Sequence, residues 1–105
     1  MLPEDRRRLA LFAKRVRAVA PQAAVSAFGS RARGSASPES DLDLCVVLPN
    51  VTRDLRDAIY AIAWEIGFDE GCMLAPIILS EEAFERAPMS ASTLVAKIRR
   101  EGVAA

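Results

Sequence analysis

The sequence contains no histidine. This absence excludes Ser–His and Cys–His nucleophile pairs, and it excludes any metal site built on imidazole. The chemical groups that remain are carboxylates, hydroxyls, arginines and lysines, which suit hard cations and phosphates. The missing histidine therefore favours chemistry on phosphates over catalysis by a histidine-activated nucleophile.

Cysteine is scarce, and long apolar runs are missing. Cys45 and Cys72 lie in apolar surroundings without a Cys-x-x-Cys spacing, so we expect buried packing cysteines rather than a disulfide or metal site. No apolar run approaches the roughly 20 residues that span a bilayer, and the first residues hold no stretch typical of a signal peptide. We expect a cytoplasmic protein with no membrane partner, folded as a single domain over residues 1–105.

Net charge is zero, but the charges are unevenly distributed. Residues 1–33 have a balance of +6, and the remaining residues have a balance of −6. A basic first third could steer an anionic substrate or partner. The alternative for Arg6–Arg17 is a solvated helix face. Binding of nucleic acid through this region is a weaker hypothesis, and nucleic acid is not the expected partner.

Hydrophobic periodicity predicts alternating helices and strands. Helices are expected over residues 3–20, 52–66, 81–86 and from Ser90 or Ser92 to Arg100, and short strands over residues 25–28, 42–48 and 73–79. Gly67 should end the second helix. Pro76 makes the third strand an edge strand or a strand end. Trp64 lies off the apolar stripe of its helix and is expected to cover an edge of the core rather than to contact a partner.

The segment between the first two strands carries the chemistry. Gly29-Ser30 follows a strand directly and opens a short helix over Ser30–Arg33, whose free N–H groups favour phosphate. Side chains alternate along a strand, so Asp41 and Asp43 project from one face, about 7 Å apart. Two carboxylates this close resist joint ionisation, and a divalent cation resolves the conflict.

Gly29-Ser30-(x)10-Asp41-x-Asp43, together with Arg-Ala-Arg-Gly over residues 31–34, resembles the signature of the DNA polymerase β-like nucleotidyltransferase superfamily. The string is similar to that of the minimal nucleotidyltransferases, which are short prokaryotic proteins, and the similarity covers the whole chain. The resemblance implies an α/β (α+β) fold: a small mixed sheet of three to four strands flanked by helices, as in the polymerase β-like palm.

The resemblance also implies an activity, namely Mg²⁺-dependent transfer of a nucleoside monophosphate, AMP in the expected case, from an NTP such as ATP to an acceptor hydroxyl, with release of pyrophosphate. Asp41 and Asp43 would be the catalytic and metal-binding residues. The nucleotide and its phosphates would contact Gly29, Ser30, Arg31, Arg33 and Ser40. For the two arginines, a plain surface role is an equal alternative.

Minimal nucleotidyltransferases are often paired with a small helical protein of the HEPN class. In such toxin–antitoxin-like modules the nucleotidyltransferase acts as the antitoxin, in some cases by adenylylating the toxin. The resemblance therefore implies a HEPN-type partner that could share the acceptor site. A homo-oligomer is left open.

One expected residue is missing. Family enzymes commonly carry a third carboxylate on the third strand, but residues 71–80 contain neither Asp nor Glu. Asp69 and Glu70 lie just before this segment, and Glu81 lies just after it. Three explanations are open: Asp69 or Glu70 substitutes through a shifted register, a partner completes the site, or catalysis is impaired. The last would leave a nucleotide-binding or partner-neutralising subunit without turnover.

Overall fold

The chain alternates helices and strands along its length. The computed structural model describes all residues from 1 to 105. Its elements are, in order, α1 (Pro3–Val19), β1 (Ala24–Phe28), α2 (Gly29–Arg33), β2 (Leu42–Leu48), α3 (Arg53–Glu70), β3 (Leu74–Ser80), α4 (Glu81–Glu85), the 3-10 helix η1 (Met89–Ala91), α5 (Thr93–Glu101) and β4 (Val103–Ala104).

The four strands form one mixed sheet in the order β3-β2-β1-β4. Strand β1 is antiparallel to both β2 and β4, whereas β2 and β3 are parallel. The expected small mixed sheet flanked by helices is therefore confirmed. Pro76 lies in β3, at the edge of the sheet, where a residue without an N–H is tolerated.

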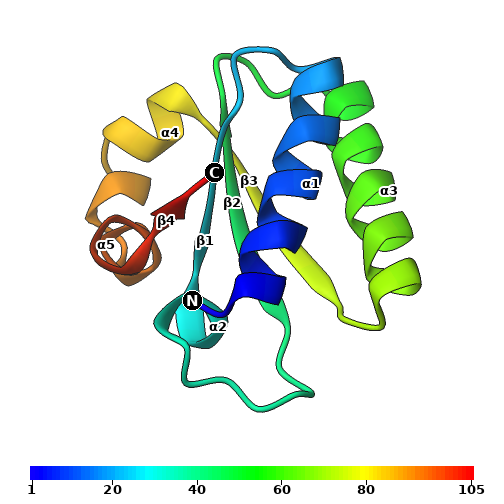
Figure 1. Ribbon diagram of the computed structural model, residues 1–105. Helices are drawn as coiled ribbons and strands as arrows, with labels where there is room; N and C mark the ends of the chain where they lie inside the picture. The colour runs from blue at the N-terminus through cyan, green and yellow to red at the C-terminus, as the bar shows by residue number, and fades with distance from the viewer.

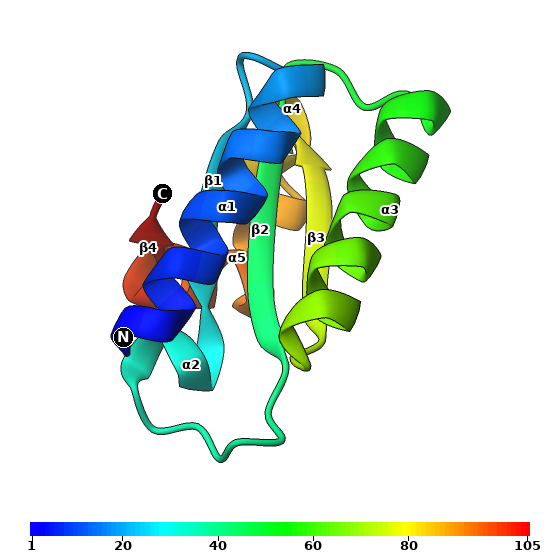
Figure 2. The same cartoon turned by 45° about the vertical axis from the view of Figure 1, so that its right-hand side comes forward.

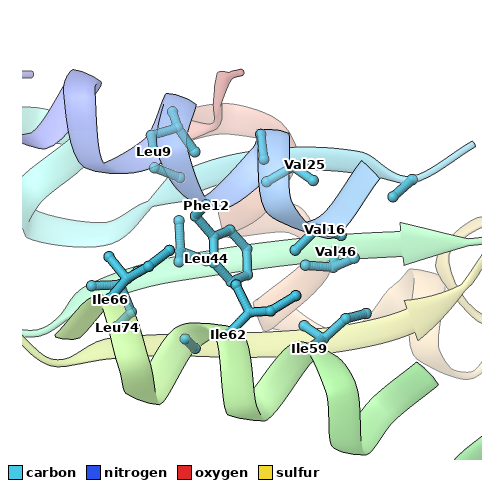
Figure 3. Packing of buried hydrophobic residues seen from close by; sticks show 14 of the residues in the cluster. Leu9, Phe12, Val16, Val25, Leu44, Val46, Ile59, Ile62, Ile66 and Leu74 are labelled. Atoms are coloured by element: carbon cyan, nitrogen blue, oxygen red, sulfur yellow. The ribbon is translucent and has the colours of Figure 1, made fainter. Parts of the chain in front are cut away.

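Helices α1 and α3 lie side by side over one face of the sheet, and α4 and α5 lie on the opposite side (Figures 1 and 2). The alternation of β2 decides which residues reach each layer: Leu42, Leu44, Val46 and Leu48 join the main core under α1 and α3. Figure 3 shows Phe12 of α1 inserted between the sheet and α3, and its side chain is fully buried. A smaller cluster under α4 and α5 contains Phe28, Cys45 and Ile98.

Asp43 belongs to the same face of β2 as Cys45 and Val47, because residues two apart share a face. Asp43, one of the two aspartates predicted to bind metal, therefore points away from the main core, toward the side covered by α5. Both cysteines are buried and free, as expected. Burial raises the pKa of the Cys45 thiol to about 11, so this thiol is not a nucleophile at neutral pH.

Two predictions about α3 were wrong. The helix continues through Gly67 to Glu70 and ends at Gly71, which adopts the left-handed conformation with φ +66°. Gly67 serves a different purpose: a Cβ there would lie 2.9 Å from the carbonyl oxygen of Cys72, so glycine lets the returning chain pack closely. Trp64 does not cover the core. Its surface is 69% exposed, and its ring stacks on Phe68 with the centroids 5.4 Å apart.

The remaining helices agree with the sequence patterns. Ser80 caps α4, and Ser92, one of the two predicted caps, accepts a hydrogen bond from the Val95 N–H at the start of α5. None of the helices combines the length and apolar character required to traverse a lipid bilayer.

Candidate active site

The Gly29-Ser30 turn packs directly against Asp43. Phe28 pairs with Asp43 across the antiparallel β1–β2 ladder, and the chain turns into α2 at the next residue. Gly29 has φ +78°, and a Cβ at this position would lie 2.5 Å from Asp43 Oδ2. Glycine is therefore required twice here, once for the backbone conformation and once for the close approach to the carboxylate.

Asp41 is exposed and immediately precedes β2, whereas Asp43 is half-buried within it. The pKa of Asp43 is raised, first because burial disfavours its charged form and second because Asp41 repels it. The positive charge of Lys97 on α5 acts in the opposite direction and lowers the pKa of Asp43. The predicted pair of interacting carboxylates is present, and it is electrostatically strained.

The residues present fit a divalent cation. The raised pKa of Asp43 is the cost of placing two carboxylates together, and a bound cation would remove that cost. No group of three or more His, Cys, Asp or Glu side chains could hold a metal ion. Mg²⁺ often takes only one or two carboxylates and completes its shell with substrate phosphates and water, so two carboxylates such as Asp41 and Asp43 would be enough to hold it.

The two serines predicted to bind nucleotide both precede the aspartates in the sequence. Ser30 is in the first turn of α2, and its side chain is partly exposed beside Gly29. Ser40 directly precedes Asp41, and its hydroxyl lies 3.2 Å from that of Ser37. Ser40 is thus adjacent to Asp41 in sequence, and Ser30 follows Gly29, which lies close to Asp43.

The two arginines have different environments. Arg33 is exposed and pairs with Glu101 of α5. Arg31 is buried, and its Nε, Nη1 and Nη2 atoms donate to Ser40 O, to Asp5 and to Pro38 O, respectively. Arg33 could reach a ligand only by leaving Glu101, whose side chain is 13% exposed, whereas Arg31 already uses its donors within the protein.

A third carboxylate is absent from the place where family enzymes carry one. Asp43 is paired in register with Ala75 of β3. Glu70 belongs to α3 and accepts hydrogen bonds from Arg7 and Arg8, which hold its pKa at about 2. Asp69 is also in α3. The explanation by a shifted register was therefore wrong, because neither residue reaches the strand.

Glu81 cannot take this place either. It follows Ser80, which pairs with Leu48 at the far end of the parallel ladder. Leu48 is five positions beyond Asp43 along the strand, which is about 17 Å at the usual rise per residue. A partner that completes the site and a loss of turnover remain as the two explanations.

The sequence patterns missed three charged residues around the site. Lys97 of α5 acts on Asp43, Asp5 of α1 is buried beneath Arg31, and Glu101 has one buried carboxylate oxygen with no hydrogen-bond partner. Each reaches the site through tertiary packing from a helix outside the motif, so no local signal could identify them. The number of residues between them and Gly29 or Asp43 in the sequence does not indicate that they lie close to the site in the fold.

The sequence model of the nucleotidyltransferase domain family matches residues 9–100. Two solved structures are similar. One is described as the crystal structure of a toxin–antitoxin with AMP-PNP; its TM-score is 0.61 at 16% identity, and the match covers 90% of this chain and 69% of that chain.

The other is a mutant of the toxin–antitoxin MntA–HpeT in which two aspartates are replaced by glutamate; its TM-score is 0.57 at 14% identity, with 95% and 70% of the two chains covered. At these identities the likeness establishes the fold. No functionally curated protein matches the sequence.

Proposed function

Because the chain belongs to the nucleotidyltransferase domain family, we propose that it transfers a nucleoside monophosphate, AMP in the first instance, from an NTP to an acceptor hydroxyl and releases pyrophosphate. The observation that carries this proposal is the close approach of the Gly29 backbone to the carboxylate of Asp43, with Asp41 near enough to raise the pKa of that carboxylate. In this proposal the Gly29-Ser30 turn binds phosphate and the carboxylates of Asp41 and Asp43 bind the metal, and the closeness of Gly29 to Asp43 supports it.

Asp41 and Asp43 would hold Mg²⁺. When bound, Mg²⁺ neutralises phosphate charge and orients the oxygens around the reacting phosphorus. Gly29 lets the chain approach closely, and the Ser30 hydroxyl with the first N–H groups of α2 binds the triphosphate. Arg33 and Ser40 contact the nucleotide from the adjoining turn. Lys97 adds a positive charge that attracts the phosphates toward Asp43.

In the proposed reaction the acceptor oxygen forms a bond to the α-phosphorus while the bond from that phosphorus to pyrophosphate breaks. The protein contributes chiefly by positioning these groups and by balancing their charge. No carboxylate of β3 lies beside Asp43 to accept the proton of the acceptor hydroxyl. A basic group of the acceptor chain, or a water molecule, would then receive this proton.

We further propose that the acceptor hydroxyl belongs to a small helical protein of the HEPN class, with this chain as the antitoxin of the pair. The HEPN class follows from the resemblance described above, and two observations support a protein partner of the toxin–antitoxin kind. Both similar structures are described as toxin–antitoxin assemblies, and one of them contains the ATP analogue AMP-PNP. The vacant position of the third carboxylate beside Ala75 also suits a site that a second chain completes.

A second candidate function is a nucleotide-binding subunit that neutralises its partner without turnover. The same observation at Ala75 favours it, because the expected third acid is absent while the phosphate turn and the aspartate pair are intact. This candidate predicts nucleotide binding with no covalent transfer.

The two candidates separate in one experiment. The candidate partner is the protein encoded by the adjacent gene. Both purified proteins are incubated with Mg²⁺ and with ATP labelled at the α-phosphorus, and the label bound to protein is measured after denaturing electrophoresis. We expect transfer to the partner by the wild type and a loss of at least a hundredfold in Asp41→Asn and Asp43→Asn.

The matched control is Asp69→Asn, which makes the same chemical change at an exposed position of α3. It should transfer label as the wild type does. ATP binding without transfer by the wild type would favour the second candidate, and equal transfer by all variants would refute the site.

A further inference from the structure

Asp5 and Arg31 are the two buried charged residues of the protein, with 1% and 7% of their surfaces exposed. Asp5 is in the first turn of α1, which lies beside α2 in Figures 1 and 2. Arg31 Nη1 lies 3.0 and 3.2 Å from the two carboxylate oxygens of Asp5, and Arg8 donates to the same carboxylate at 3.0 Å. Apolar residues of similar size often stabilise a fold as well as a buried ion pair does, so stability alone does not account for this pair.

The other nitrogens of Arg31 bind the segment that leads to the aspartates. Nε donates to Ser40 O at 2.7 Å, and Nη2 donates to Pro38 O at 2.9 Å. Both carbonyls belong to residues 35–41, which have no helix or strand of their own. Because the guanidinium group is planar and its donors diverge at fixed angles, one side chain aligns this segment with α1 and α2 together.

The Ser40 carbonyl is the group that matters most for the site. It shares one planar peptide unit with the N–H of Asp41, so fixing its direction fixes how the chain enters Asp41. On the other side of Asp41, the Leu42 N–H donates to Met73 O at 2.8 Å. Asp41 is thus an exposed residue placed between two anchored peptide groups, one held by Arg31 and the other by the start of the β2–β3 ladder.

We propose that Arg31 and Asp5 are positioning residues for the carboxylate of Asp41: Arg31 fixes the peptide group that precedes it, and Asp5 fixes Arg31. This inference rests on the function proposed above, in which Asp41 holds the metal. It gives Arg31 a role different from a phosphate contact. The N-terminal helix acquires a role in the site through Asp5, although none of its residues reaches the aspartate pair.

The test uses Arg31→Lys in the full chain. Lysine keeps the positive charge near Asp5, but its single nitrogen cannot bind Asp5, Pro38 O and Ser40 O at the same angles. The measurement is Mn²⁺ affinity by electron paramagnetic resonance in the presence of AMP-PNP, with thermal unfolding as a check on folding. We expect the affinity to fall at least tenfold, the usual scale when a group that orients a metal ligand is lost.

Arg15→Lys is the matched control, because Arg15 also forms an ion pair between helices but contacts Glu65, away from residues 35–41. Its Mn²⁺ affinity should stay within about twofold of the wild type. A folded Arg31→Lys protein with wild-type affinity would overturn the proposal. Should that variant fail to fold, Asp5→Asn replaces it: asparagine keeps the size of the side chain but loses the charge and one of the two acceptor oxygens, so Arg31 is held less firmly and the Mn²⁺ affinity should again fall, whereas wild-type affinity would overturn the proposal.

A measurement on the unaltered protein decides the matter if neither variant folds. Linkage is reciprocal, so if Arg31 favours metal binding at Asp41, metal bound there must strengthen the bond from Arg31 Nε to Ser40 O. By NMR, exchange of the Arg31 Nε proton with solvent should slow when Mg²⁺ and AMP-PNP are added. Unchanged exchange would contradict the proposal.

These readouts do not depend on turnover. A wild-type protein that binds Mn²⁺ through Asp41 but moves no label refutes the transferase activity and leaves the positioning role intact. If the wild-type protein transfers label and Arg31→Lys has the same metal affinity as the wild type, the transferase activity is supported and the positioning role of Arg31 is refuted.

Discussion

Replacing Gly29 with alanine should damage the site far more than it damages the fold. A Cβ at Gly29 would lie 2.5 Å from Asp43 Oδ2, whereas ordinary van der Waals contact begins at 3.4 Å. The carboxylate must therefore move by about 1 Å, and a displacement of that size at a reacting centre costs about a hundredfold in rate. The left-handed backbone at φ +78° adds about 1–2 kcal/mol of destabilisation for any residue with a Cβ.

Gly71→Ala separates the two effects. Gly71 has φ +66°, and a Cβ there would meet nothing within 4 Å, so this variant has the same kind of backbone strain without the contact. Each variant should lower the melting temperature by roughly 4–8 °C for each kcal/mol lost. Label transfer and Mn²⁺ affinity should collapse only in Gly29→Ala. If both variants keep full activity, the contact between Gly29 and Asp43 does not set the position of the carboxylate.

Three further predictions concern stability. Asp43→Asn should melt at a higher temperature than the wild type at pH 7 without metal, because the raised pKa of Asp43 means that its ionised form destabilises the fold. This advantage should vanish below about pH 3.9, and a lower melting temperature of the variant at pH 7 would contradict the repulsion and desolvation assigned to Asp43. Glu70→Gln should melt at a lower temperature than the wild type at pH 7, because Arg7 and Arg8 hold the pKa of Glu70 at about 2. The difference in melting temperature should shrink as the pH falls from about 4.3 toward 2, and a difference that does not change with pH would show that the charge of Glu70 does not stabilise the fold. Phe12→Ala should lose about 3–5 kcal/mol in urea unfolding, because Phe12 is fully buried between α1, α3 and the sheet; a loss below 1 kcal/mol would mean that the core collapses around the cavity.

Helix and strand positions followed from local patterns, but the way they pack did not. The apolar period of α1 and the alternation of β2 each identify a face, and both faces are buried as expected. The prediction that Gly67 ends α3 was wrong for a tertiary reason. Glycine is needed there because the returning chain at Cys72 packs closely against it, and not because the helix ends. The pairing of Val103 with Ala27 likewise joins segments far apart in sequence, which periodicity cannot connect.

The centre of the site was predictable because its residues are close in sequence. Gly29 and Ser30 are in α2, Asp43 is in β2, and Asp41 directly precedes β2, so a single local motif identifies all four. The surroundings were not predictable. The sequence left Arg31 either as a phosphate ligand or as a surface arginine, and the surface alternative was wrong, because Arg31 is buried and binds Asp5, 26 residues earlier.

The measurement that tests the central claim most directly follows two labels of ATP in the same reaction. The wild-type protein, Mg²⁺ and the purified partner are incubated with ATP labelled at either the α- or the γ-phosphorus. Nucleotidyl transfer predicts that α-label becomes covalently bound to the acceptor, that γ-label is released as pyrophosphate, and that both signals disappear in Asp43→Asn. Transfer of γ-label to the acceptor, or no covalent α-label under any condition, would contradict the account.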